Sequence, residues 1–184
     1  MNDFTAGWWQ AALHRPSPNC DAWPAGAQLD MLIIHAISLP PQEFGGPFID
    51  ALFRNQLRVA DHPALCGLAG LRVSAHFFIE RGGRVVQFVP LTARAWHAGV
   101  STFGGRPACN DRALGIELEG ADTCPFTSAQ YDALVTLSES LRARYPRITL
   151  SRIVGHSDVA LGRKTDPGPC FDWVMFRARL CGAR

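Results

Sequence analysis

Two histidines and one aspartate have the residue types and the positions to bind a metal ion. His35 follows the apolar run "MLII" and His156 follows "RIVG", so each stands at the carboxyl end of an expected strand, where open α/β folds usually place ligands. Asp166 lies in the turn-rich segment after His156. Two imidazoles and a carboxylate leave one position of a Zn²⁺ ion for water, the catalytic arrangement. Spacing alone leaves another interpretation open, because a single histidine at such a place is most often a hydrogen-bonded core or edge residue.

Two glutamates and a lysine could also take part in chemistry at such a site. Glu117 and Glu119, in "GIELEG", share one side of an expected strand, and periodicity does not choose between them. Lys164, in "GRKTDPG", is the single lysine of a chain that otherwise uses arginine. A compact ammonium can approach an oxyanion more closely than a broad guanidinium can. The alternative for Lys164 is a surface side chain paired with Asp166 or Asp158.

Strands and helices alternate in the sequence, which favours an α/β domain with a mixed central sheet flanked by helices. The helix starting after Thr127 is signalled by a capping box with Gln130 and ends before Pro146. The other expected elements are strands at 29–37, 113–120 and 152–156, a hairpin at 73–90 through Gly82-Gly83, and helices at 48–57 and 171–180.

At 184 residues the chain fits one domain. Residues 1–28, rich in Pro, Trp and Ala, are expected to form an irregular arm that packs Trp8, Trp9 or Trp23 onto the domain of residues 29–184. The Pro- and Gly-rich stretch 37–70 is expected to form a mobile cover over the metal cleft.

Composition argues against several classes of protein. A net charge of +2 with scattered arginines argues against nucleic-acid binding, and the apolar runs are too short to span a membrane. The six cysteines form no CxxC pair, and no export signal begins the sequence. Reduced thiols and a cytoplasmic location are therefore expected.

Several segments together resemble the zinc amidase and peptidoglycan-recognition superfamily, in particular its cytosolic amidases that act on 1,6-anhydro-N-acetylmuramyl-L-alanine. The resemblance covers roughly residues 29 to 180, and its most specific segments are "IIHAISLPPQEFGGPFIDALF", "GLRVSAHFFIERGGRVVQFVPLTARAWHAGVSTFGG", "ALGIELEG" and "GHSDVALGRKTDPGPCFDW". It implies one Zn²⁺ per chain, bound by His35, His156 and Asp166, with Glu117 and Lys164 assisting catalysis.

These implied roles agree with the chemistry of the side chains. Zinc polarises a carbonyl and acidifies water. Glu117 can take a proton from water and pass it to the leaving amine, and Lys164 can stabilise the oxyanion. Glu119 is then expected to be a structural partner.

The resemblance also implies a muropeptide as the small-molecule substrate. Arg72 could bind one of its carboxylates, Trp96 could stack on its sugar, and His97 could belong to the same wall. The alternatives are a surface charge for Arg72 and a core aromatic for Trp96. Ala36 departs from the asparagine usual in the family, which bears on substrate binding.

The expected function is hydrolysis of the amide between the lactyl group of 1,6-anhydro-N-acetylmuramic acid and L-alanine, in cell-wall recycling. By lowering the level of such fragments, the reaction could damp β-lactamase induction. Two alternatives are a non-catalytic muropeptide-binding module and an exported amidase acting on intact murein.

Overall fold

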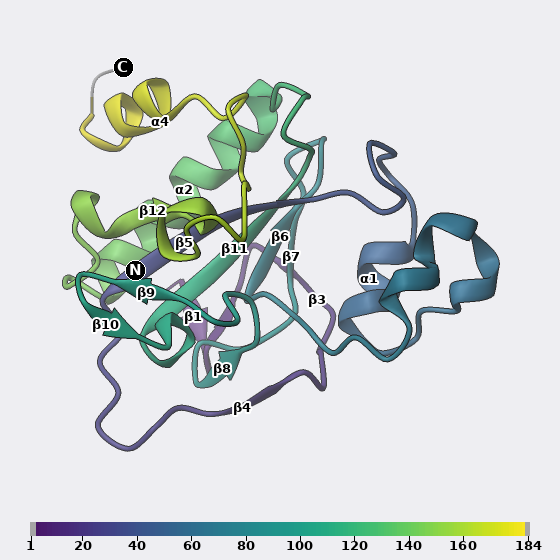
Figure 1. The fold of residues 1–184 in the computed structure, drawn as a ribbon. Coiled ribbons are helices and arrows are strands. Elements are labelled where there is room, and N and C mark those ends of the chain that lie inside the picture. Colours follow the sequence, from purple (N-terminus) through teal and green to yellow (C-terminus); the bar gives the residue numbers. More distant parts are fainter. Residues whose placement is uncertain (1–2, 183–184) are drawn as a thin grey trace.

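A six-stranded mixed sheet forms the centre of the computed structural model, which describes residues 3–182 (Figure 1). Across the sheet the strands are β12 (Ile153–Gly155), β5 (Met31–Ile37), β11 (Ala113–Glu119), β6 (Phe77–Ile79), β7 (Val85–Gln87) and β3 (Leu13–His14). The first four are parallel, whereas β7 pairs antiparallel with β6. Gly83, at φ +84°, turns the chain between β6 and β7. The predicted mixed sheet and hairpin are confirmed.

Four α-helices surround this sheet. They are α1 (Phe48–Phe53), α2 (Ser128–Arg144), α3 (His156–Val159) and α4 (Trp173–Leu180). The 3-10 helices cover Val59–Asp61, Pro63–Leu68, Cys109–Asp111 and Leu150–Arg152. Three small antiparallel pairs join β1 (Phe4–Thr5) to β2 (Trp8–Trp9), β4 (Cys20–Ala22) to β8 (Ala93–Ala95), and β9 (Thr102–Phe103) to β10 (Arg106–Pro107).

The longest helix, α2, begins as the capping box predicts. Thr127 Oγ1 accepts the Gln130 N–H (3.1 Å), and Gln130 Oε1 accepts the Thr127 N–H (3.1 Å). Its apolar face, including Leu134 and Leu141, packs on one face of the sheet in the largest core cluster. Figure 1 shows α2 running behind the central strands.

The opposite face of the sheet is divided into two apolar clusters with polar side chains between them. One cluster joins α1 to Phe78 and Val86, and the other joins Met31 and Ile33 to Val154. Since side chains alternate along a strand, His35 and Glu117 point to this face rather than to α2. The sheet therefore presents its polar strip on the side away from its longest helix.

Two elements differ from the sequence-based expectation. The helix at 48–57 ends at Phe53, because Asn55 adopts the left-handed conformation at φ +58°, which an α-helix does not continue through. The N-terminal arm contains short strands instead of being wholly irregular, and β3 closes one edge of the main sheet. Trp9 is buried in the main core, whereas Trp8 and Trp23 are half-buried.

Within residues 3–182, no helix is long and apolar enough to cross a membrane. All six cysteines have free thiols.

Candidate metal centre

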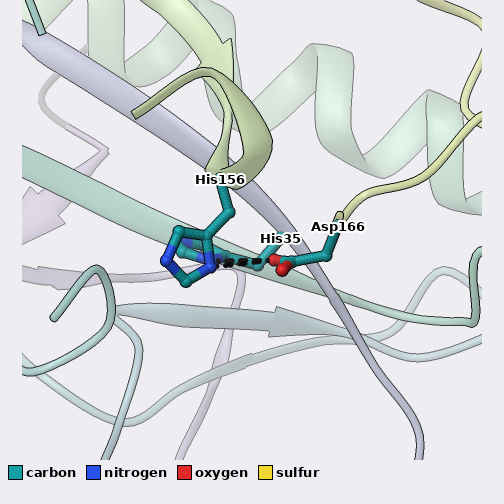
Figure 2. A group of neighbouring side chains, drawn as sticks. All are labelled: His35, His156 and Asp166. Carbon is teal, nitrogen blue, oxygen red and sulfur yellow. Dashed lines mark hydrogen bonds and ion pairs between the residues drawn. The ribbon is translucent and has the colours of Figure 1, made fainter. Parts of the chain in front are cut away.

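Parallel pairing brings the three candidate ligands together. On β5, His35 pairs with Glu117 of β11. The preceding residue of β5, Ile34, pairs with Gly155, the last residue of β12. His156 therefore follows at the same edge as His35. The turn after α3 returns Asp166 to them, and Figure 2 shows the three side chains pointing toward one another. His35 Nδ1 lies 3.0 Å from His156 Nδ1, and Asp166 Oδ2 lies 3.2 Å from the first and 3.1 Å from the second.

The backbone acceptors around the two imidazoles favour tautomers in which both ring nitrogens that face Asp166 carry a lone pair rather than a proton. His156 Nε2 lies 3.1 Å from the carbonyl oxygen of Ala98, an acceptor, so its proton is on Nε2. His35 Nε2 lies 3.0 Å from His97 Nδ1, and His97 Nε2 faces the carbonyl oxygen of Ala113 at 3.3 Å. His97 thus donates to Ala113 and accepts from His35. In this tautomer, the Nδ1 of His35 that faces His156 and Asp166 is left unprotonated.

The resulting donor set fits a cation. Three lone-pair atoms meet with no proton between them, which is unfavourable unless a positive charge lies at their centre. Ligands of a tetrahedral zinc ion, about 2.0–2.2 Å from the metal, are about 3.3–3.6 Å from one another. The observed separations of 3.0–3.2 Å are close to that range. Burial also lowers the pKa of His35 to about 4, which keeps the ring neutral, as a metal ligand must be.

Glu117 stands beside the three candidate ligands without being one of them. Its Oε1 is 4.0 Å from His35 Nδ1, and its Oε2 is buried with no hydrogen-bond partner among the described residues. Burial raises the pKa of the Glu117 carboxyl well above its usual value, the charge of Asp166 raises it further, and the Lys164 ammonium opposes both. An unpartnered carboxylate oxygen at this point can accept a proton from a bound molecule.

Lys164 is exposed and close enough to influence Glu117. The carboxylates that the sequence offered as its partners are engaged elsewhere. Asp158 Oδ2 accepts the Gly155 N–H (2.7 Å), and Asp166 Oδ2 faces the two histidines. The ammonium group is therefore available to a bound molecule.

Glu119, which shares a face with Glu117, has a different environment. Its two oxygens accept the backbone N–H groups of Gly45 and Arg81 (2.5 and 3.0 Å), and the residue is 3% exposed. These bonds tie the loop before α1 and the hairpin turn to β11. The position of Glu119 agrees with the structural role expected for it.

The four expected substrate-binding residues occupy different places. His97 is buried and contacts His35. Trp96 is half-buried, and its backbone carbonyl accepts the Ser74 N–H. Arg72 is exposed beside a separate cavity of about 140 Å³ near α1. Ala36 packs against the main core cluster, on the face of β5 opposite His35.

Sequence reasoning missed the contact between His97 and His35 and the glycine that allows it. A Cβ atom on Gly115 would lie 2.5 Å from Cγ of His97, so the ring lies directly on the backbone of β11. The Gly115 N–H also donates to Nδ1 of the buried His76 (3.0 Å). A glycine inside an otherwise β-rich run was the available signal, since such glycines often mark a close approach.

His76 makes stability depend on pH. Burial lowers its pKa to about 3, whereas an unfolded histidine titrates near 6.5. Between these values the unfolded chain binds a proton that the folded chain does not, so the free energy of unfolding falls as pH falls. The loss from this group reaches about 2 kcal/mol at about pH 5.

Urea unfolding of metal-free protein at several pH values measures this loss. The His76→Asn variant keeps an acceptor for the Gly115 N–H, but its side chain cannot titrate. Its free energy of unfolding should therefore decrease less steeply than that of wild type as the pH is lowered. Equal slopes for the two proteins would contradict the assignment.

Comparison with known proteins gives one consistent result. The sequence profile of the family described as N-acetylmuramoyl-L-alanine amidase (Amidase_2) matches residues 25–169. The chain is 53% identical over 174 residues to the 1,6-anhydro-N-acetylmuramyl-L-alanine amidase AmpD of Enterobacter cloacae, an alignment covering 95% of this chain and 92% of that relative.

Solved structures agree with this. A crystal structure of a Se-Met AmpD derivative superposes with a TM-score of 0.92 at 51% identity, covering 95% of this chain and 97% of that one. The Escherichia coli amidase AmiD, solved with the substrate anhydro-N-acetylmuramic acid-L-Ala-D-gamma-Glu-L-Lys, gives 0.61 at 30% identity, covering 86% of this chain and 60% of that one.

Proposed function

Because the chain belongs to the N-acetylmuramoyl-L-alanine amidase family and is an amidase of this type, we propose that it acts on 1,6-anhydro-muropeptides with the help of one Zn²⁺ ion. The bond cleaved joins the lactyl group of 1,6-anhydro-N-acetylmuramic acid to L-alanine. The reaction belongs to the recycling of cell-wall fragments, and by lowering their level it would damp β-lactamase induction. The identity to AmpD over nearly the whole chain supports this choice of substrate.

The observation that carries the zinc proposal is the meeting of three unprotonated ligand atoms from His35, His156 and Asp166. When bound there, zinc supplies Lewis-acid chemistry, which polarises the scissile carbonyl and makes water acidic enough to lose a proton near neutral pH. Three protein ligands leave room for a further group, as catalytic sites require.

Two side chains perform the proton and charge chemistry in this proposal. Glu117 accepts a proton from the attacking water at its unpartnered oxygen and delivers it to the leaving alanine nitrogen. Lys164 places its ammonium beside the oxygen that becomes negatively charged. Glu117 lies 4.0 Å from His35 Nδ1, which supports its part in this proposal.

Two cavities are lined by residues adjacent to the proposed site in strand pairing or in sequence, although none of the proposed ligands lines either cavity. One, of about 410 Å³, includes Phe78, which pairs with Glu117 across the sheet, and extends to Arg15 and Arg84. The other, of about 520 Å³, includes Val159 and Ala160 of the segment that begins at His156.

The substrate contacts remain predictions. Trp96 stacking on the sugar and Arg72 binding a carboxylate await a bound substrate, and His97 contacts His35 rather than a cavity among those described. Ala36 would affect substrate only through the local backbone, because its side chain faces the core. We also propose a cytoplasmic site of action, a compartment in which the six cysteines would stay reduced.

The test is incubation of the zinc-loaded protein with a purified anhydromuropeptide, followed by mass spectrometry. We expect two products, the anhydro sugar and a peptide with a free L-alanine amine, whose masses sum to substrate plus one water. Intact murein sacculi serve as the comparison substrate. Binding without cleavage would favour the recognition module, and faster cleavage of sacculi would favour the murein amidase.

A further inference from the structure

His97 is a buried histidine that the chemistry proposed above does not use, yet it contacts a proposed ligand. Its Nδ1 lies 3.0 Å from His35 Nε2, and the two rings meet edge to face with centroids 5.1 Å apart. Its other nitrogen lies 3.3 Å from the carbonyl oxygen of Ala113. A chain of contacts thus runs from the first residue of β11 through two imidazoles to the metal-facing nitrogen.

The Ala113 carbonyl determines the direction of this chain. A carbonyl only accepts, so the His97 proton lies on Nε2 and its Nδ1 is an acceptor. His35 must then hold its own proton on Nε2. With all protons reversed, a lone pair of His97 would face a lone pair of Ala113 inside the core, where an unsatisfied polar contact costs about 1–3 kcal/mol.

We propose that His97 is a positioning residue that keeps the metal-facing Nδ1 of His35 free of a proton, a role that rests on the proposed function of His35 as a ligand. If His97 Nδ1 is removed, the His35 proton has no acceptor at Nε2 and is better placed on Nδ1. Asp166 Oδ2 lies 3.2 Å from Nδ1 and would accept it. The proton would then occupy the place of the metal and compete with it.

The backbone of β11 is shaped around this arrangement. Gly115 leaves the space that the His97 ring fills, since an added Cβ would lie 2.5 Å from Cγ and 2.6 Å from Nδ1. The His97 and Ala98 N–H groups both donate to Asn110 Oδ1 (3.3 and 2.9 Å). The ring is thus held from its backbone, from its face and at both nitrogens.

The experiment compares wild type with His97→Phe and His97→Asn. Phenylalanine keeps a ring but removes the acceptor, whereas asparagine places an oxygen near the position of Nδ1. In metal-free protein, two-bond ¹H–¹⁵N spectra report which nitrogen of His35 is protonated, and competition with a chromophoric chelator gives the zinc affinity. We expect His97→Phe to move the proton toward Nδ1 and to weaken zinc binding about 10–100-fold. We expect His97→Asn to restore much of both.

Two further variants separate hydrogen bonding from packing. Gly115→Ala displaces the ring without removing it and should weaken zinc binding as His97→Phe does. His76→Phe removes another buried imidazole, which contacts His97 but has no hydrogen bond to His35, so it should lower stability and leave zinc affinity close to wild type.

An unchanged His35 tautomer and zinc affinity in His97→Phe would overturn the proposal, as would failure of His97→Asn to restore them. If His97→Phe does not fold, Gly115→Ala with wild-type affinity overturns it instead. The spectra need neither metal nor substrate, so failure of the zinc amidase proposal would be recognised separately, by a wild-type protein that binds no zinc.

Discussion

Replacing Glu117 by glutamine is expected to lower kcat by about 10²–10⁴-fold, the range for loss of a general acid–base group. The amide has nearly the same shape but cannot take a proton from water. Glu117 Oε1 is 4.0 Å from His35 Nδ1 and lies outside the ligand triad, so the variant should bind zinc normally. Product release from an anhydromuropeptide and zinc content, measured on one preparation, check both statements. A kcat close to wild type would remove Glu117 from the chemistry.

Glu119→Gln is the matched control, on the same strand and the same face. Glutamine offers one oxygen to the two N–H donors of Gly45 and Arg81, leaving an amide NH₂ against the other. Its kcat should remain near wild type while the free energy of unfolding falls by about 1–3 kcal/mol. A large loss of kcat here, with Glu117→Gln active, would mean that the two carboxylates have exchanged the roles assigned to them.

His156→Ala is expected to remove both the metal and the activity. Loss of a group that only supports a ligand costs about 10–100-fold in affinity or activity, and loss of a ligand should cost at least as much. The variant should contain little zinc by elemental analysis after dialysis, and its rate should equal that of wild type stripped by a chelator. Zinc should restore the stripped wild type and fail to restore the variant.

His62→Ala tests whether loss of any histidine has this effect, because His62 is half-buried, lies outside the candidate ligand set and only accepts the Ala64 N–H at the start of a 3-10 helix. It should keep its zinc and its rate. Full activity of the chelated wild-type protein would contradict metal-dependent hydrolysis altogether.

The elements with strong local signals were predictable from the sequence. The capping box of Thr127 and Gln130 predicts the start of α2, and the Gly82-Gly83 pair predicts the hairpin turn. Apolar runs rich in β-branched residues predict β5 and β11. The candidate ligands follow from the same strands, because parallel neighbours end at one edge of a sheet. His35 and His156 were therefore expected together without knowledge of the register.

Contacts between distant segments were not predictable in this way. Nothing local to His97 shows that its ring would lie on Gly115, since that contact depends on how residues 91–112 return across the sheet. The early end of α1 depends on the left-handed Asn55, whose side chain exchanges hydrogen bonds with Asn19 of the N-terminal arm (2.9 Å). Contacts with distant segments therefore determine both the position of the His97 ring and the end of α1.

The separation of the proposed ligands along the chain governs when the proposed centre can form during synthesis. His35 precedes His156 by 121 positions and Asp166 by 131. A ribosome releases the first ligand early, but β12, which aligns the second, emerges only after α2. The nascent chain thus carries His35 without its two partners through most of translation, and the three side chains can meet only after β12 and Asp166 have been made. Assembly of the proposed centre is accordingly tied to completion of the sheet.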